Sequence, residues 1–336
     1  MSSKNLFNYL QLAYAPISNY DFAVVKDDKI IKGYMNKASI YVIVQRPVLR
    51  FQNLDLDKTD PFNPFLTFEI HQEGNERILF GKMPIYQENF GADKDQGIQI
   101  GITHTFPKPK YETLGFPFKD VANFVFRTTS EDVIWLSPEK LIYHYLRNTV
   151  DADISQGIPD LLKYQVHYIG KSTEQDIVER LTGHSRLQDI LSIERPLNFG
   201  SLPTDEISIL FLEFQDNIGM MSIGEEDGDE EMQKMVDMLM GKQLYNEKTI
   251  YLDAEKALIN ALKPKHNRQL YNNYPESVDG LKKHNLDLLT YSLLDPITLM
   301  YNDGEISGNK SYLGTDVIII KNGEKLVIEK SKQNNQ

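Results

Sequence analysis

The sequence predicts an α/β fold, and three observations support that prediction. Short segments rich in β-branched and aromatic residues recur through residues 1–150, which is typical of a β-rich domain. Strand-like and helix-like segments then alternate through residues 151–270. Near the end, two apolar segments flank Asn322-Gly323, the pair that favours a tight hairpin turn. We therefore expect an α/β sandwich with a small mixed central sheet, preceded by a β-rich N-terminal domain and followed by a C-terminal β-hairpin extension.

The chain has 336 residues, which is more than one hydrophobic core usually organises. We place the boundaries so that residues 1–150 form the β-rich domain, with a possible role in positioning a substrate. Residues 151–270 form the α/β domain, and residues 271–336 form the extension. A block of acidic residues around Gly228 predicts a solvated insertion at about residues 216–248.

Composition limits the classes of function. The chain has no cysteine, which excludes disulfides, thiolate zinc sites and cysteine nucleophiles. Its net charge of −12 counts against a nucleic-acid enzyme, because duplex affinity depends on Lys and Arg near phosphates. No apolar run approaches the roughly 20 residues of a membrane span, and residues 1–15 mix polar with apolar side chains, unlike a signal peptide. We expect a cytoplasmic protein without a membrane partner.

In the first domain, β-branched and aromatic segments between turn-forming residues predict strands at residues 38–44, 66–70, 98–102 and 123–126. Ser137 followed by Pro138 is a typical helix start, because serine caps the free N–H groups and proline suits the first helical position. This helix should run through about Arg147 and lead into the second domain.

The second domain should alternate strand and helix. The apolar run at residues 207–214 is typical of a central strand covered on both faces. Asp253 is the expected N-cap of a helix that ends at Pro264. The other predicted elements are a strand at residues 164–169, one or two helices at residues 174–181 and 187–191, and a Met-rich helix around residues 232–240.

One set of residues in this domain occurs in a distinctive order. It consists of Tyr168-Ile169-Gly170-Lys171, Arg180, His184, Glu255, Pro264 and Asn267. This order and its spacing resemble the GIY-YIG nucleases over about residues 157–270. In that family a tyrosine on a strand, an arginine on the next helix and a distant glutamate converge on one metal-bound phosphodiester. The resemblance implies a metal-dependent endonuclease in a GIY-YIG-like domain, with DNA favoured over RNA by the habit of the family.

The resemblance also implies a role for each residue. Glu255 would be the sole protein ligand of Mg²⁺ or Mn²⁺, with water in the other positions. Tyr168 would take the proton from the attacking water. Because a phenol has an ordinary pKa of about 10, nearby cations must stabilise its anion, and Lys171 and Arg180 would be those cations. His184 lies one helical turn after Arg180, where the family carries His or Tyr.

Asn267 would have a structural role, with its amide bonded to the backbone beside the active site. Next to it, the sequence places the basic residues Lys263, Lys265 and Arg268, together with aromatic residues that include Tyr271 and Tyr274. These side chains could follow a phosphate backbone and stack on bases. They could equally be the cations that complement the dipole at a helix C-terminus.

The chain departs from the family about ten residues before Tyr168. The first half of the motif belongs there, but the sequence reads Gly157-Ile158-Pro159, with proline in the place of the tyrosine. Either this Gly-Ile is coincidental and the first strand comes from elsewhere, for example from residues 133–136, or the tyrosine has been lost. Tyr164 is a candidate substitute donor.

Two other hypotheses remain. The missing tyrosine and the negative charge favour a catalytically inactive scaffold that binds protein or nucleic acid. If the motif match is accidental, the chain would instead be a structural or assembly component. The nuclease hypothesis requires Tyr168, Arg180 and Glu255 to face one cleft beside Lys171 and His184.

Overall fold

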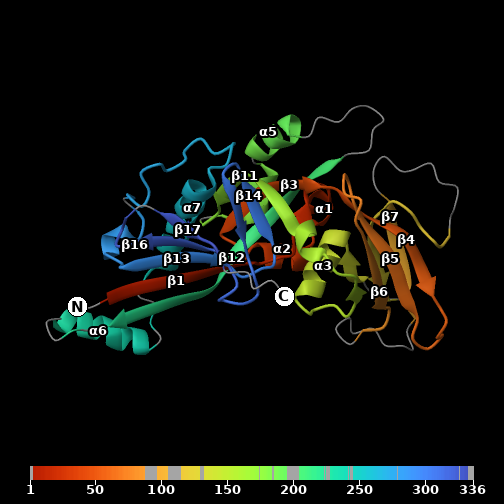
Figure 1. Cartoon of the computed structure of the whole chain (residues 1–336), viewed down its shortest axis with the longest axis horizontal. Helices are drawn as coiled ribbons and strands as arrows, with labels where there is room; N and C mark the ends of the chain where they lie inside the picture. Colours follow the sequence, from red (N-terminus) through yellow and green to blue (C-terminus); the bar gives the residue numbers. More distant parts are fainter. Residues whose placement is uncertain are drawn as a thin grey trace.

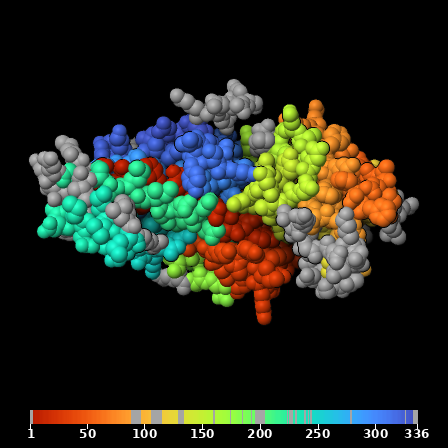
Figure 2. Space-filling model, turned by 90° about the horizontal axis from the view of Figure 1, so that it is seen from below, coloured from red at the N-terminus to blue at the C-terminus, as the bar shows by residue number. Residues whose placement is uncertain are grey.

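The computed structural model describes residues 3–87, 97–104, 115–128, 132–173, 175–183, 185–194, 204–222, 224, 228–240, 242, 245–277, 279–324 and 326–331. Within these residues the chain forms two β-sheets and seven α-helices, a mixed α/β fold. The smaller sheet lies at one end of an elongated molecule, and helix α6 (Asp229–Leu239) lies at the other (Figure 1). The second view separates the same two ends, and part of the red N-terminal segment lies between them (Figure 2).

The larger sheet has ten strands in the order β15-β14-β11-β3-β12-β1-β13-β16-β17, with β2 paired to β12. It is mixed, because β1 runs parallel to β13 and β11 runs parallel to β14. The prediction of a small central sheet is therefore wrong, since strands from both ends of the chain add to it. The strands are β1 (Ser3–Leu12), β2 (Ile17–Ser18), β3 (Ile40–Pro47), β11 (Lys163–Lys171), β12 (Asp205–Ser222), β13 (Leu288–Leu293), β14 (Thr298–Tyr301), β15 (Gly304–Ser307), β16 (Val317–Lys321) and β17 (Val327–Glu329).

The smaller sheet has seven strands and lies between β3 and β11 in the sequence. Its order is β10-β6-β5-β4-β8-β7, with β9 paired to β8. Helix α3 (Pro138–Leu146) lies between β9 and β10 in the sequence, with Ser137 as N-cap as predicted. The strands are β4 (Leu49–Asp57), β5 (Phe65–Gln72), β6 (Ile78–Pro84), β7 (Gln99–His104), β8 (Val121–Arg127), β9 (Asp132–Leu136) and β10 (Asp153–Ile154).

The predicted boundaries at residues 150 and 270 do not separate sheets. Strands β1 and β3 come from the first predicted segment, yet they share a sheet with β11 and β12 from the second and with β13 from the third. The sequence between β3 and β11 is the part that forms a sheet of its own. The β-rich unit is therefore an insertion between two neighbouring strands, which a linear division of the sequence cannot represent.

Helices cover both faces of the larger sheet. Side chains alternate along β3, so that Tyr41 and Ile43 pack with one group of helices while Val42 and Val44 pack with the core that includes α7 (Glu247–Leu262). The first group consists of α1 (Asn19–Val25), α2 (Lys29–Met35), α4 (Ile177–Thr182) and α5 (Ser185–Ile193). The predicted central strand is confirmed, because residues 207–212 are buried without interruption.

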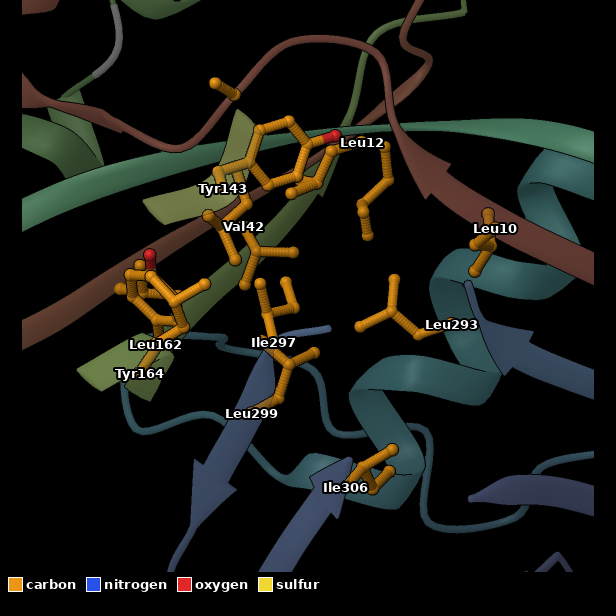
Figure 3. Close-up of a cluster of buried hydrophobic side chains, with 14 of the residues drawn as sticks. Leu10, Leu12, Val42, Tyr143, Leu162, Tyr164, Leu293, Ile297, Leu299 and Ile306 are labelled. Atoms are coloured by element: carbon orange, nitrogen blue, oxygen red, sulfur yellow. The ribbon is translucent and has the colours of Figure 1, made fainter. Parts of the chain in front are cut away.

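The main core joins the large sheet to α3. Leu10, Val42, Leu293 and Leu299 point toward one another from four different strands, and Tyr143 approaches them from α3 (Figure 3). All five side chains are at most 5% exposed. Because each such burial stabilises the fold by roughly 1.5–3 kcal/mol, this core is sufficient to fix the sheet relative to α3.

Asp253 is not the N-cap that the sequence analysis expected. Helix α7 begins six residues earlier, where the Asn246 side chain caps it by accepting a hydrogen bond from Lys248 N. Asp253 lies inside the helix and is buried. Its carboxylate accepts hydrogen bonds from the Tyr291 hydroxyl at 2.7 Å and from Leu281 N at 2.6 Å. A buried carboxylate is tolerated in a helix interior when tertiary donors satisfy it.

Two predictions near the chain end and the acidic block have different outcomes. The C-terminal hairpin is confirmed, because β16 pairs with β17 and both Asn322 and Gly323 have positive φ, at 52° and 65°. The acidic block is helical from Asp229 onward, in α6, rather than a loop throughout. Residues 225–227 of that block lie outside the described residues.

None of the helices in the described ranges is long and apolar enough to cross a membrane.

Candidate active site

Two tyrosines meet where β3 and β11 pair. In this antiparallel pair Gly170 lies opposite Tyr41 and Tyr168 lies opposite Ile43. The rings of Tyr41 and Tyr168 have centroids 6.0 Å apart and are inclined by 33°. A Cβ at residue 170 would lie 2.5 Å from both Cζ and the hydroxyl oxygen of Tyr41. Glycine is therefore required at residue 170, because the Tyr41 phenol passes directly over it.

Arg180 connects this pair of tyrosines to helix α4. Its Nε lies 3.4 Å from the Tyr41 hydroxyl, to which it donates a hydrogen bond. The helix is held at its start by Asp176, whose carboxylate caps it and also pairs with Lys32 of α2 at 2.9 Å. The predicted helix at residues 174–181 thus exists, with its start at Ile177, and it directs Arg180 toward the tyrosines.

Tyr168 is a neutral phenol in this environment. Burial raises its pKa, and a hydrogen bond with Tyr41 and the charges of Arg180 and Arg186 lower it only in part. Arg186, on α5, is a cation that the sequence analysis did not identify. Lys171, which was expected to stabilise the phenolate, instead forms an ion pair with Glu255. The cations beside Tyr168 are therefore the two arginines.

Glu255 reaches the site from the middle of α7. Its side chain is 10% exposed, and Oε2 lies 2.9 Å from Lys171 Nζ. Oε2 is a buried atom, and its ion pair with Lys171 is the contact that the described residues give it. Burial raises the pKa of Glu255, while the charges of Lys171, Lys256 and Arg180 oppose the shift. The surrounding positive charges thus offset only part of the effect of burial on Glu255. The charge of its carboxylate in turn raises the pKa of Tyr168 and of Arg180.

Asn267 fastens the segment after α7 to β11. Its Oδ1 accepts from Ile169 N at 2.9 Å, and its Nδ2 donates to Ile169 O at 2.8 Å. Strand β14 pairs with β11 only from Lys163 to Gln165, so the edge of β11 at Ile169 has no strand beside it. The amide of Asn267 replaces that missing strand, and the expectation that it bonds the backbone here is confirmed.

The remaining predicted residues have different outcomes. His184 lies outside the described residues. Tyr164 is fully buried and donates to Glu139 Oε1 at 2.7 Å, so it is not the substitute donor. Gly157-Ile158-Pro159 begins a 3-10 helix at residues 158–162 rather than a strand. Residues 133–136 belong to β9, in the smaller sheet, and are not the partner of β11 either.

In the basic segment after α7, some side chains are exposed and others have partners within the protein. Lys263 and Arg268 are exposed, and Lys263 ends α7 in a left-handed conformation with φ of 43°. Lys265 Nζ lies 2.7 Å from Glu194 Oε1. Tyr274 is buried, and its hydroxyl donates to Asp253, so it cannot stack on a base. Only part of the predicted nucleic-acid surface is thus available at this point of the fold.

The donor set at Glu255 fits a hard divalent cation. A buried carboxylate is a hard oxygen donor of the kind that Mg²⁺ or Mn²⁺ prefers, and Mg²⁺ keeps several of its own waters. Glu255 is not part of any group of three or more ligating side chains among the described residues. A metal here would therefore have one protein ligand.

The sequence analysis missed Tyr41. The signal was present as Ser39-Ile40-Tyr41, directly before an apolar run, and it differs from Gly-Ile-Tyr by one residue. It was hidden because the whole smaller sheet separates it from Tyr168 in the chain.

Comparisons with models of protein families, with curated proteins and with solved structures give no significant match. The candidate active site consequently depends on the order of its residues and on the geometry described above.

Proposed function

We propose that this chain is a metal-dependent endonuclease of the GIY-YIG type. The observation that carries the proposal is the pair Tyr41 and Tyr168, on neighbouring antiparallel strands and separated by Gly170, beside Arg180 and a buried Glu255. In this proposal Ser39-Ile40-Tyr41 takes the place of the first half of the motif. The smaller sheet is then an insertion between the two motif strands and would position the nucleic acid.

In this proposal Tyr168 is the general base, and it acts in its phenolate form. The phenol first loses its proton to solvent, an ionisation that the charges of Arg180 and Arg186 favour, and the phenolate then takes the proton of the attacking water. Arg180 also presents a planar fork that suits phosphate oxygens. Tyr41, held by Arg180, fixes the orientation of the Tyr168 ring.

Glu255 would hold the Mg²⁺ or Mn²⁺ ion, which supplies charge stabilisation at the phosphate when bound. Burial has already removed most of the water from this carboxylate. Its electrostatic attraction for a cation is therefore stronger than that of an exposed glutamate. Lys171 supplies that positive charge in the metal-free protein.

The substrate class in the proposal is nucleic acid, with DNA favoured. Lys263 and Arg268 are exposed cations in the segment that Asn267 fastens beside Tyr168. Lys265 adds a third charge when it leaves Glu194. Because the chain carries a net charge of −12, we expect the productive complex to depend on this local group and to weaken steeply with added salt.

The test is cleavage of supercoiled DNA, linear DNA and RNA with Mg²⁺ or Mn²⁺. We expect Glu255→Ala, Tyr168→Phe and Tyr41→Phe each to lose about 100-fold or more in rate, the range for a positioned acid or base. Glu247→Gln, an exposed change on the same helix, and Tyr20→Phe, at a side chain 56% exposed, are the matched controls. Cleavage that survives Glu255→Ala in a folded variant would show that the assigned site is wrong.

A catalytically inactive scaffold is the second candidate, and one observation favours it. Glu255 already has a cationic partner in Lys171, and burial raises the pKa of its carboxyl. Absence of cleavage on all three substrates, with nucleic acid still bound in a gel-shift assay, would support the scaffold.

A further inference from the structure

A second group of metal-ligating side chains consists of His167, Glu194 and His266 and does not include Glu255. His167 lies on β11, Glu194 follows α5, and His266 lies in the segment after α7. One ligand atom from each residue lies within 4.8 Å of the others. The group contains two imidazoles and one carboxylate, whereas the proposed nuclease site has a single carboxylate. It is therefore chemically distinct from the site at Glu255.

The three side chains are already close to a metal-binding arrangement. His266 Nε2 lies 2.7 Å from Glu194 Oε1, and the rings of His167 and His266 have centroids 5.9 Å apart. Around a tetrahedral ion with bonds of about 2.0–2.1 Å, neighbouring ligand atoms lie about 3.3 Å apart. A small outward movement of His266 and Glu194, with release to solvent of the proton that His266 Nε2 now donates to the carboxylate, would admit such an ion. The backbone is fixed, because His266 N donates to His167 O at 3.0 Å.

Gln45 determines the tautomer of His167. Its Nε2 donates to the backbone carbonyl of Glu194 at 3.2 Å, which identifies the other atom of the amide as the acceptor Oε1. That oxygen lies 2.7 Å from His167 Nε2, so His167 donates a proton there and carries its free lone pair on Nδ1. A hydrogen bond of this kind, which orients a histidine from behind, is the usual support of a metal-ligating imidazole.

The three residues are largely shielded from water. His167 is 6% exposed, and the side chains of Glu194 and His266 are 14% and 10% exposed. The attraction between a cation and the Glu194 carboxylate is stronger in such a surrounding than at an exposed position.

We propose that His167, Glu194 and His266 bind one transition-metal ion of the zinc class, with a fourth position left for water. Two nitrogens and one oxygen suit Zn²⁺ or Co²⁺ and disfavour Mg²⁺, which prefers oxygen alone. The ion connects β11, the end of α5 and the segment after α7, immediately beside Tyr168 and the Asn267 clamp. In this proposal the ion holds these three segments together beside the candidate active site. The proposal does not depend on the nuclease proposal.

Lys265 is the competitor of that ion. Its Nζ lies 2.7 Å from Glu194 Oε1, and its side chain is 62% exposed, so it can move into solvent when a metal neutralises the carboxylate. Removing its charge should therefore strengthen metal binding, whereas removing a ligand should weaken it. His266→Asn removes a ligand without removing a negative charge, so weaker binding in that variant separates the loss of a ligand from a general charge effect.

The experiment is a titration of the full chain, first stripped with a chelator, with Co²⁺ followed by visible absorption and with Zn²⁺ as competitor. We expect one equivalent to bind, with the absorption of a four- or five-coordinate Co²⁺ ion. Glu194→Gln and His266→Asn should weaken binding by about 100-fold or more, Gln45→Ala by about 10–100-fold, and Lys265→Met should tighten it. His284→Asn, remote from the group in sequence, and Glu247→Gln, at an exposed position of α7, should leave it unchanged.

Thermal unfolding gives a second readout. Zn²⁺ should raise the unfolding temperature of the wild type, because an ion that binds only the folded chain stabilises it, and it should not do so in Glu194→Gln. Absence of a Co²⁺ spectrum in the folded wild type overturns the proposal. A spectrum that is equally strong in Glu194→Gln and His266→Asn overturns it as well. If one of these variants fails to fold, the other and Lys265→Met still decide.

Discussion

Gly170 and Tyr41 lie opposite each other in the β3–β11 pair, and the Tyr41 phenol occupies the space that a side chain at residue 170 would need. The contact also involves Tyr168, whose Cε1 would be 2.8 Å from a Cβ at that position. One backbone position thus sets the relative placement of both tyrosines.

Gly170→Ala should therefore displace both rings. Tyr41 is fully buried and cannot move aside, so we expect a loss of about 1–3 kcal/mol in the free energy of unfolding, together with loss of any cleavage. Urea unfolding and the cleavage assay measure the two effects. Gly183→Ala is the control, because no atom lies within 4 Å of its Cβ position. A Gly170→Ala protein as stable and active as the Gly183→Ala protein would contradict the described contact.

Asn267→Ala should loosen the edge of β11. The substitution leaves the N–H and C=O of Ile169 without the partners that the amide now provides, in a strand segment where Ile169 itself is fully buried. We expect a loss of about 2–3 kcal/mol, because unpaired buried backbone groups cost more than the bonds contribute. Hydrogen exchange of the Ile169 amide should also accelerate. Asn272→Ala, at an exposed position of the same segment, should change neither quantity.

The buried ion pair between Arg46 and Glu139 should be the most sensitive polar contact of the fold. Arg46 Nη2 lies 2.7 Å from Glu139 Oε2, with side chains 1% and 2% exposed, and it also meets Glu206 at 2.6 Å. Glu139→Gln removes a charge that a buried guanidinium needs, so we expect a loss of about 3 kcal/mol in urea unfolding. Asp237→Asn, which breaks the more exposed pair with Lys242, should cost no more than about 1 kcal/mol. Equal effects of the two changes would contradict this assignment.

His144 should make the fold sensitive to acid. Burial, with the charges of Lys140 and Arg147, lowers the pKa of this imidazole from its ordinary 6.5 to about 4. The unfolded chain therefore binds a proton at a pH where the folded chain does not. The stability that His144 contributes is complete above about pH 6.5 and is lost as the pH falls toward 4.

The loss should amount to at most about 3 kcal/mol, the equivalent of the full shift. Urea unfolding of wild type and His144→Gln at neutral pH and near pH 4 measures it, since the variant should lose less stability between the two conditions. His71→Gln, at a more exposed histidine, is the control and should follow the wild type. Parallel curves for wild type and His144→Gln would contradict the prediction.

The sequence alone determined the elements whose causes are local. Ser137 and Pro138 specify the start of α3, and Asn322-Gly323 specifies the turn between β16 and β17, because caps and tight turns depend on a few adjacent residues. The apolar run in β12 likewise predicted a covered central strand. The order of Tyr168, Arg180 and Glu255 indicated which residues to examine, although not how they meet.

Only the tertiary structure decided which strand accompanies β11. The candidates close to Tyr168 in the sequence were Pro159 and Tyr164, whereas the partner strand is β3, on the far side of an inserted sheet. Asp253 was assigned as a cap for the same reason, since its true partners, Leu281 and Tyr291, follow much later in the chain. Strand pairing and buried hydrogen bonds join residues that are distant in sequence, so a local pattern cannot specify them. Tyr41 became part of the candidate site only because the backbone of β3 pairs with that of β11 across the inserted sheet.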